Sequence, residues 1–315
     1  MTYLVVGSGS VGRRHAQNLA NLGVKVALIS WRAEGIKGVL NWLNASDVTG
    51  LVIATATDIR LPLIEAAAAR GVPLFIEKPL SHDLAEIETV YSLLSSDLQQ
   101  RSMLGVMMRY HPLVRHLKGE VSGQPFRARF EVGHDVTVWR DNWRFAESYA
   151  AHPVTGGALL DLCHELDLAH VLLGTLELHK VVALGHPDFP GVDLASHATL
   201  TANPAATVTV SVDYLSPQLI RKGQIVGADC AHSYDLAKGS VTRQTKNAET
   251  TITFGCERNQ MFLDIMAEFI SLAERRDLDP DPLRPTLDQA RASIELTAKA
   301  HAARYFIGEM DVQLT

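Results

Sequence analysis

A short apolar run leads directly into a glycine-rich turn at the start of the chain. The predicted strand Tyr3–Val6 is followed by Gly7, Gly9 and Gly12 with the spacing G-x-G-x-x-G, and then by a helical stretch over 13–22. The first glycine permits a tight turn, the second a close approach to a pyrophosphate, and the third close packing of helix on strand. The unpaired N–H groups of the helix favour an anion there. The order predicts a dinucleotide site; the alternative is a plain glycine-rich turn.

A lysine follows a second apolar run. The predicted strand Pro73–Glu77 is followed by Lys78 and Pro79. In open α/β sheets, ligands bind at the carboxyl ends of the strands, so a lysine at this point is placed over the binding crevice. Proline makes the exit from the strand rigid. The alternative is a solvated lysine in a loop.

Four polar residues interrupt an otherwise apolar helix that is predicted over Ala158–Leu173: Asp161, His164, Glu165 and Asp167. At 100° per residue, His164 and Glu165 lie within about 60° of Asp161, whereas Asp167 lies roughly 120° away. The spacing therefore predicts that the first three side chains share one helix face and converge on a pocket. The alternative is a set of buried polar groups that hold the helix to a sheet.

The residues after the second predicted strand, Val24–Ser30, bear on the choice of cofactor. An acidic residue at this position binds the ribose hydroxyls and favours NAD. Here Ser30 is followed by Arg32, and no carboxylate occurs before Glu34. A hydroxyl and a guanidinium suit a 2′-phosphate. NADP(H) is therefore favoured and NAD(H) is possible, the alternative being an Arg32 that stacks on adenine or is solvated.

Apolar runs alternate with helical stretches over the first 120 residues. Further strands are predicted at Gly50–Thr55, Pro73–Glu77 and Ser102–Met107, with helices at Leu61–Arg70 and Asp83–Leu94. This alternation predicts an α/β fold with a doubly wound parallel sheet, the Rossmann arrangement, over residues 1–120.

Residues 121–315 have a different pattern, which predicts an α+β domain for substrate binding and oligomerisation. Several strand-like runs separated by short turns indicate a large, mostly antiparallel open sheet: Phe126–Val138, Leu178–Gly185, Ala195–Thr201, Ala206–Tyr214, Leu219–Gly227 and Thr250–Phe254. A loop is predicted over Trp139–Thr155. Two helices, Arg258–Arg276 and Leu287–Phe306, follow on either side of a proline-rich loop. One expected arrangement places the last helix back against the first domain.

Composition excludes several classes of protein. A net charge of -6 leaves no basic footprint for nucleic acid. No apolar run approaches the roughly 20 residues of a membrane helix. Met1 leads straight into the first strand, so a signal peptide is not expected. The 3 cysteines have no Cys-x-x-Cys spacing, which indicates reduced thiols and a cytoplasmic location. The 13 histidines form no zinc-like pattern, so no metal is expected.

The combination of these motifs resembles the glucose–fructose oxidoreductase / inositol dehydrogenase / MocA (Gfo/Idh/MocA) family. The resemblance covers essentially the whole chain and rests on the glycine turn, Ala54-Thr55, Glu77-Lys78-Pro79, Arg109-Tyr110-His111-Pro112 and the helix after Gly156-Gly157. It implies a Rossmann domain, a second domain with an open sheet, and hydride transfer between a nicotinamide cofactor and a sugar-like carbon. The run from His164 to Asp167 is similar to a subgroup linked to nucleotide-sugar or nonulosonic-acid metabolism.

The resemblance also implies roles for individual residues. Lys78 matches the lysine that holds the reacting oxygen, and His164 matches the general acid–base. Asp161 resembles an assisting aspartate that in many members precedes the histidine by four positions, whereas here it precedes it by three. The expected cofactor-binding residues are Gly7, Ser8, Gly9, Ser10, Val11, Gly12, Ser30, Arg32, Ala54, Thr55, Glu77 and Lys78. The expected substrate-binding residues are Arg109, Trp143, Tyr149, His152, Asp161 and His164.

The function expected from these features is an NAD(P)-dependent oxidoreductase that acts on a sugar, polyol, sugar acid or nucleotide sugar. The alternative is a non-catalytic protein that senses NAD(P) on the same fold. Members without catalysis are expected to lack the lysine or the histidine, and this chain has both Lys78 and His164. A homodimer or homotetramer through the C-terminal sheet is expected, with no nucleic-acid or membrane partner.

Overall fold

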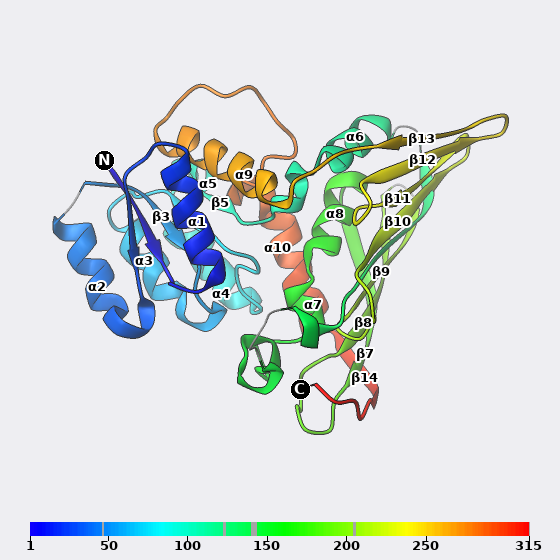
Figure 1. The fold of residues 1–315 in the computed structure, drawn as a ribbon, viewed down its shortest axis with the longest axis horizontal. Coiled ribbons are helices and arrows are strands. Elements are labelled where there is room, and N and C mark those ends of the chain that lie inside the picture. The colour runs from blue at the N-terminus through cyan, green and yellow to red at the C-terminus, as the bar shows by residue number, and fades with distance from the viewer. Residues whose placement is uncertain (46, 122–123, 140–143, 204–205, 315) are drawn as a thin grey trace. The chain divides into compact units, whose positions relative to one another are not determined.

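The chain forms two compact units, each made from two separate stretches of sequence. The computed structural model describes residues 1–45, 47–121, 124–139, 144–203 and 206–314 (Figure 1). The first unit consists of 1–110 and 257–291, and the second of 111–256 and 292–315. This division differs from a single boundary near residue 120, because a C-terminal stretch returns to the first unit.

The first unit is built on a parallel sheet. Its strands are β1 (Thr2–Val6), β2 (Val26–Ile29), β3 (Val48–Ile53), β4 (Leu74–Ile76) and β5 (Met103–Leu104). They lie in the order β2-β1-β3-β4-β5, and every neighbouring pair is parallel. Helices cover both faces of such a sheet, which explains why β1 and β4 are apolar runs that are buried throughout. The doubly wound parallel sheet predicted from the sequence is confirmed.

The described helices that lie wholly in this unit are α1 (Ser10–Asn21), α2 (Trp31–Ala45), α3 (Leu61–Ala68), α4 (Leu84–Leu93), α5 (Ser96–Arg101) and α9 (Arg258–Ala273). α1 packs against α9, whereas α2 packs against α3 and α3 against α4. The ring of Phe269 on α9 meets the rings of Tyr3 and Phe75 edge-on at centroid distances of 6.0 and 5.7 Å. The penultimate helix therefore completes the core over the parallel sheet.

The second unit is built on a nine-stranded sheet. Its strands are β6 (Pro125–Gly133), β7 (Leu176–Gly185), β8 (Ala195–Ala202), β9 (Ala206–Asp213), β10 (Ile220–Gly227), β11 (Cys230–Asp235), β12 (Ser240–Thr245), β13 (Glu249–Thr253) and β14 (Arg304–Glu309). Their order is β13-β12-β11-β10-β6-β9-β8-β7-β14. Only the β6–β9 and β7–β14 pairs are parallel among these strands. The sheet is therefore mostly antiparallel and open, as the sequence predicts.

Helices pack on one face of this sheet. The second unit contains α6 (Pro112–Glu120), α7 (Ala158–Asp161), α8 (His164–Leu173) and most of α10 (Leu287–Ala302). α7 contacts β8 and β9, and α8 contacts β6, β7 and β9 (Figure 1). Buried and solvated positions alternate along β8 and β9, because side chains of successive residues point to opposite faces.

Several predicted elements differ from the structure. The helix expected over Ala158–Leu173 is two helices, interrupted at Leu162 and Cys163. The last helix ends at Ala302 rather than at Phe306, because the aromatic run after it pairs with β7 as β14. Strands β11 and β12 lie in polar sequence that shows little apolar alternation. The predicted loop over Trp139–Thr155 contains short 3-10 turns in its described part.

None of the described helices combines the length and the apolar character needed to cross a membrane.

Candidate functional site

The glycine turn has the steric features that a nucleotide cradle requires. Gly7 has a φ of +114°, and a Cβ there would lie 2.3 Å from the Ala54 carbonyl oxygen. A Cβ on Gly12 would lie 1.8 Å from the Gly7 carbonyl oxygen, so α1 packs close to the turn. Around Gly9, by contrast, a Cβ would meet no atom within 4 Å. The turn is compressed where helix and strand meet and open where a pyrophosphate would approach, which fits a dinucleotide.

The N-terminus of α1 leaves its N–H groups available. The N-cap residue is Gly9, which provides no side-chain cap, and the first turn of the helix holds no acidic residue. Ser10 is exposed and Val11 is half-buried. Arg13 is occupied within the turn, where its Nε donates to the Ser8 carbonyl oxygen at 2.8 Å. The first N–H groups of a helix and the positive end of its dipole favour an anion at such a position.

The site lies where the strand order reverses. The chain passes from β1 to β2 on one side and then to β3 on the other, so the turn after β1 lies at the topological switch point of the sheet. Ala54 and Thr55 directly follow β3, and the Ala54 N–H donates to the Val6 carbonyl oxygen at 2.9 Å. The structure therefore brings these two predicted residues beside the glycine turn.

At the end of β2, the chain turns at once into α2. The Gly7 N–H donates to the Ile29 carbonyl oxygen at 3.0 Å, which holds the end of β2 against the turn. Ser30 is half-buried and Arg32 is exposed in the first turn of α2. Glu34 lies in the same turn. No ion pair involves Arg32 among the residues that the structure describes.

Lys78 lies in a segment that a buried arginine holds in place. Arg60 is only 3% exposed. Its Nη1 donates to the carbonyl oxygens of Glu77 and Pro79, on either side of Lys78. Its Nη2 donates to the Thr55 carbonyl oxygen at 2.8 Å. One guanidinium therefore joins the segments that follow β3 and β4.

The Glu77 carboxylate bonds to α1. Its Oε1 lies 2.6 Å from Nε2 of His15, a side chain with no exposed surface. Burial by itself raises the pKa of Glu77, but the hydrogen bond from His15 and the positive charges of His15, Lys78 and Arg60 outweigh it and lower that pKa. The ionised form of the carboxylate is therefore favoured, and its contact with α1 ties the Lys78 segment to the helix that follows the glycine turn.

Arg109 and Tyr110 are core residues of the first unit. The Arg109 side chain is only 1% exposed, so a direct contact with substrate stays a prediction. Tyr110 donates its hydroxyl to the Glu268 carboxylate on α9. Arg284 also binds that carboxylate, at 2.7 Å.

In the second unit, a buried aspartate caps α7. Asp193 has no exposed surface, and its Oδ2 accepts from the Leu159 N–H at 2.9 Å and from Ser196 Oγ at 2.7 Å. Arg304 balances its charge in an ion pair. Gly157 has a φ of +96°, and a Cβ there would lie 2.1 Å from Asp193 Oδ1. Glycine is thus required for the close approach that starts the helix.

Asp161 is held by two phenols. Its Oδ2 accepts from the Tyr149 hydroxyl at 3.0 Å and lies 3.3 Å from the Tyr214 hydroxyl. Tyr214 is buried and also donates to the Gly157 carbonyl oxygen at 2.9 Å. Burial, followed by the nearby charge of Asp161, raises the pKa of Tyr214, so its hydroxyl stays protonated and able to donate. The structure therefore brings the predicted residues Tyr149 and Asp161 together.

Glu165 does not share a pocket with Asp161. Arg221 on β10 forms a two-point ion pair with it, with Nε to Oε1 at 2.8 Å and Nη2 to Oε2 at 3.2 Å. Glu165 is 2% exposed and anchors α8 to the sheet. The expectation of one polar helix face was wrong, because the break after Asp161 ends the regular 100° step on which it depends.

The remaining predicted residues of the second unit lie in different surroundings. His164 begins α8 and is 3% exposed. His152 is exposed, and its Nδ1 accepts from the Thr155 N–H at 3.2 Å. Asp167 is buried on α8. Trp143 lies outside the described residues.

Several side chains that shape these clusters are not among the residues predicted from the sequence: His15, Arg60, Asp193, Tyr214 and Arg221. For His15 the sequence does contain a signal. It lies three residues, about one helical turn, after Gly12, on the buried side of a helix that must pack on the sheet. Each of the other four also has a partner that is distant in sequence, which no local pattern reveals.

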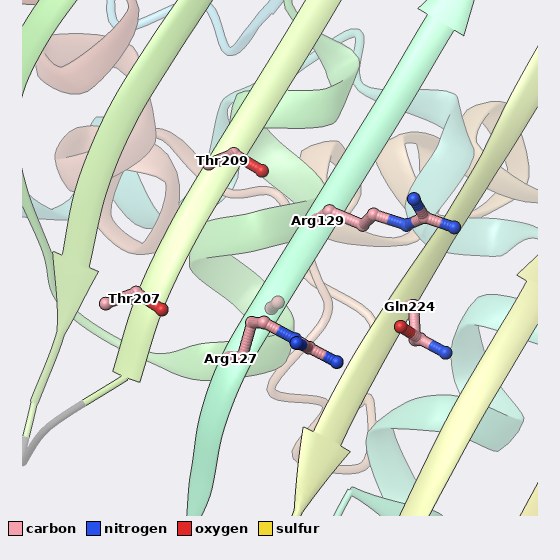
Figure 2. Close-up of a pocket in the computed structure, with 6 residues that line it drawn as sticks. Arg127, Arg129, Thr207, Thr209 and Gln224 are labelled. Carbon is pink, nitrogen blue, oxygen red and sulfur yellow. The ribbon is translucent and has the colours of Figure 1, made fainter.

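A hollow of about 370 Å³ lies on the nine-stranded sheet. Figure 2 shows its lining side chains on β6, β9 and β10, which are those of Arg127, Ala128, Arg129, Thr207, Thr209 and Gln224. None of them is a predicted site residue.

Comparisons with known proteins support the resemblance drawn from the motifs. No family model matches the chain. The chain is 25% identical over 189 residues to an inositol 2-dehydrogenase from Rhizobium meliloti, covering 54% of each protein. It thus spans about half the length of the curated relatives that it matches.

Solved structures match over nearly the whole chain. A UDP-N-acetylglucosamine 3-dehydrogenase from Acidithiobacillus ferrooxidans has a TM-score of 0.76 at 19% identity, covering 96% of this chain and 97% of that one. A 3-ketoreductase from Actinomadura kijaniata, in complex with NADP and TDP-benzene, has a TM-score of 0.78 at 16% identity, covering 98% and 99%. At these identities the matches establish the fold alone.

Fold and site together define a protein with a Rossmann-type unit and a second unit built on a large open sheet. The chain is similar in sequence, over about half its length, to proteins named inositol dehydrogenases, and in fold, over nearly all of it, to sugar-nucleotide oxidoreductases. These likenesses support the resemblance to the Gfo/Idh/MocA family.

Proposed function

We propose that the chain is an NAD(P)-dependent oxidoreductase that transfers a hydride between a nicotinamide and a hydroxyl or carbonyl carbon of a carbohydrate-like substrate. The observation that carries this proposal lies in the first unit. A nucleotide turn shaped by Gly7, Gly9 and Gly12 follows β1, and Lys78, with carbonyl groups on both sides held by Arg60, follows β4. Relatives named inositol 2-dehydrogenase and UDP-N-acetylglucosamine 3-dehydrogenase support it.

The proposed chemistry divides between the two units. When bound, the nicotinamide supplies the hydride acceptor or donor. The Lys78 ammonium donates a hydrogen bond to the reacting oxygen and stabilises the charge that develops there. His164 takes the hydroxyl proton during oxidation and returns it during reduction. The Asp161 carboxylate, held by Tyr149 and Tyr214, orients the substrate.

The residues proposed to hold the cofactor are those at the carboxyl ends of β1, β2, β3 and β4. They comprise Gly7, Ser8, Gly9, Ser10, Val11, Gly12, Ser30, Arg32, Ala54, Thr55, Glu77 and Lys78. We favour NADP(H) over NAD(H), because exposed Arg32 has no described carboxylate partner and a guanidinium binds a phosphate through paired hydrogen bonds. Glu77 acts through its main chain and its contact with α1, since His15 occupies its carboxylate.

The proposed substrates are sugars, polyols, sugar acids and nucleotide sugars. Arg109, Trp143, Tyr149 and His152 are the residues proposed to contact them, together with Asp161 and His164. Tyr149 supports this, because its side chain is exposed and its hydroxyl donates a hydrogen bond to the Asp161 carboxylate, which we propose contacts the substrate.

We also propose a homo-oligomer assembled through the nine-stranded sheet, in the cytoplasm. Apolar side chains exposed on β14 support self-association, with Tyr305 at 66% and Ile307 at 60% exposure. An exposed apolar edge strand tends to pair with another chain. The cysteines, which are all free thiols, support a reducing compartment. Light scattering coupled to size-exclusion chromatography measures the mass; a monomer would overturn the assembly.

The function is tested with purified protein, NADP⁺ or NAD⁺, and a panel of polyols, sugars, sugar acids and nucleotide sugars. Reduction of the nicotinamide, read from its absorbance, is the expected result with at least one class. Tight cofactor binding without turnover on any class would instead favour the sensing protein.

Two variants separate the catalytic roles from structural ones. Lys78→Ala should lower kcat by roughly 100-fold or more, the scale of one lost electrostatic contact, with little change in cofactor affinity. His164→Asn should lower kcat by about 100-fold and flatten the rise of the oxidation rate with pH that a general base produces. Normal turnover per folded molecule in either variant would remove that residue from the mechanism.

A further inference from the structure

We propose that Arg60 and His15 are positioning residues that hold the Lys78 main chain in register with the nucleotide turn. The inference rests on the proposed function and goes beyond it, because neither residue belongs to the set assigned to cofactor or substrate. Both act through the segment that carries Lys78.

Arg60 bonds on both sides of Lys78. Its Nη1 donates to the Glu77 and Pro79 carbonyl oxygens, while Nε and Nη2 donate to the Thr55 carbonyl oxygen at 3.3 and 2.8 Å. These carbonyls follow two neighbouring strands, β3 and β4, so a single planar group joins two strand ends. Arg60 is 3% exposed, and a buried charge persists only where hydrogen bonds compensate for lost water.

The hydrogen bonds from Arg60 to these three carbonyls depend on the planar shape of the guanidinium. Arginine presents five N–H donors in a rigid planar fork, whereas lysine offers a compact point charge on a flexible stem. Lysine at this position keeps the charge but cannot reach the same acceptors in one plane. A conservative Arg60→Lys change therefore tests the geometry separately from the charge.

His15 holds the same segment from another direction. Its Nε2 lies 2.6 Å from Glu77 Oε1, and its ring meets the Phe75 ring edge-on at 5.1 Å. His15 lies on α1, the helix that begins at the glycine turn. The Glu77 side chain thus links the helix that would receive the pyrophosphate to the residue before Lys78.

Together these contacts hold the Lys78 segment from two directions, from α1 through His15 and from the end of β3 through Arg60. Catalytic groups need placement to within a fraction of an ångström, and a displacement of about 1 Å can cost roughly 100-fold in rate. We therefore expect loss of either contact to act on turnover more than on binding.

The first measurement needs no substrate. Amide hydrogen exchange over residues 53–57 and 74–82 is compared between the natural chain, Arg60→Lys and the matched control Arg70→Lys. Arg70 is another arginine of this unit that donates to a main-chain carbonyl, that of Ala66 at 3.1 Å, at the end of α3. Faster exchange by about 10-fold or more in both segments is expected only for Arg60→Lys. Equal protection in all three proteins would overturn the proposal.

The second measurement uses the substrate that the panel identifies. Arg60→Lys should lower kcat roughly 10- to 100-fold while KM and cofactor Kd stay within about threefold. A purely structural role predicts a lower melting temperature with unchanged kcat per folded molecule, and that result would overturn the positioning role. If the natural chain turns over no member of the panel, the proposed function fails, and hydrogen exchange alone decides whether the contacts hold this segment.

A His15 pair keeps the proposal testable if Arg60→Lys does not fold. His15→Leu removes the donor to Glu77, whereas His15→Gln retains an amide N–H donor. The proposal expects loss of protection and of kcat in His15→Leu, and recovery of most of both in His15→Gln. Equal behaviour of the two variants would overturn it.

Discussion

At the scale of single residues, two arginines of the first unit, Arg60 and Arg32, differ in exposure and in the partners of their donors. Arg60 has its donors occupied by main-chain carbonyls. Arg32 is exposed in the first turn of α2, directly after β2. An arginine whose donors are free of described carboxylates is the one suited to bind a ligand phosphate.

Replacement of Arg32 therefore tests the choice of cofactor. Arg32→Ala should weaken the binding of NADP by about 10-fold or more, the scale of one lost charged hydrogen bond, and change that of NAD little, because only NADP carries the 2′-phosphate. Fluorescence titration of both cofactors measures the two affinities. Equal losses of affinity for the two cofactors would show that Arg32 does not bind the 2′-phosphate.

His111 makes the stability of the second unit depend on pH. It is 4% exposed, and its Nδ1 accepts from the Leu113 N–H at 3.1 Å as the N-cap of α6. Burial, and then the charge of Arg221, lowers the pKa of His111, so the folded chain holds it neutral. As the pH falls through about 6.5, the unfolded chain takes up a proton before the folded chain does. The free energy of unfolding must therefore decrease.

His111→Asn keeps a capping side chain but removes the titration. We expect urea unfolding between about pH 7 and pH 5 to show a shallower loss of stability in this variant than in the natural chain. His179→Asn, at an exposed histidine, serves as the control and should keep the natural slope. An unchanged slope in His111→Asn would show that other groups dominate the pH dependence.

At the scale of elements, the break between α7 and α8 decides which polar residues work together. α7 is capped by Asp193 and ends at Asp161, which two tyrosines hold. A separate helix, α8, begins at His164, and Glu165 on this helix forms an ion pair with Arg221 on the sheet. Two short helices thus present neighbouring acidic residues to different surroundings, one to the candidate site and one to the core.

The two carboxylates should therefore respond differently to neutralisation. Glu165→Gln leaves Arg221 without its charge partner and should destabilise the chain by about 3 kcal/mol, the lower end of the cost of breaking a buried ion pair. Turnover per folded molecule should stay near normal. Glu147→Gln, which removes an exposed pair with Arg144 at 3.5 Å, should change stability by less than about 1 kcal/mol. Urea midpoints measure both, and similar shifts in the two variants would contradict the assignment.

At the scale of the whole molecule, each unit is completed by a stretch that is distant in sequence. α9 lies more than a hundred residues beyond the last strand of the parallel sheet, yet Phe269 fills the space between Tyr3 and Phe75. Its Glu268 binds both Tyr110 and Arg284. The first unit is therefore incomplete until 257–291 is present.

A truncated chain tests this dependence. A fragment of residues 1–120 should expose the apolar surface that α9 covers, bind a hydrophobic dye and melt without a cooperative transition. Joining 257–291 to residue 110 through a flexible glycine–serine linker should restore cooperative melting in circular dichroism. A fragment 1–120 that melts as cooperatively as the joined chain would show that α9 is dispensable for this unit.

Local spacing was sufficient to predict the glycine turn and the parallel sheet. The G-x-G-x-x-G run constrains its own backbone, because Cβ atoms at Gly7 and Gly12 would meet atoms of the same turn and of Ala54, directly after β3. Apolar runs of strand length likewise indicate strands that are buried on both faces of a parallel sheet. The position of Lys78 shortly after a strand was predicted for the same reason, because it follows from the apolar run that precedes it.

Contacts between distant segments decided the rest. No periodicity in the sequence marks the break at Leu162 and Cys163. The helical angles predicted for the residues after Asp161 were wrong for that reason. Glu165 meets a residue 56 positions away, and Arg60 meets carbonyls of a different strand end. The sequence by itself determined the conformations that each segment adopts through its own sterics and apolar pattern. Only the tertiary structure decided which charges became partners, because a buried charge bonds to whatever group the packing of remote elements brings within reach.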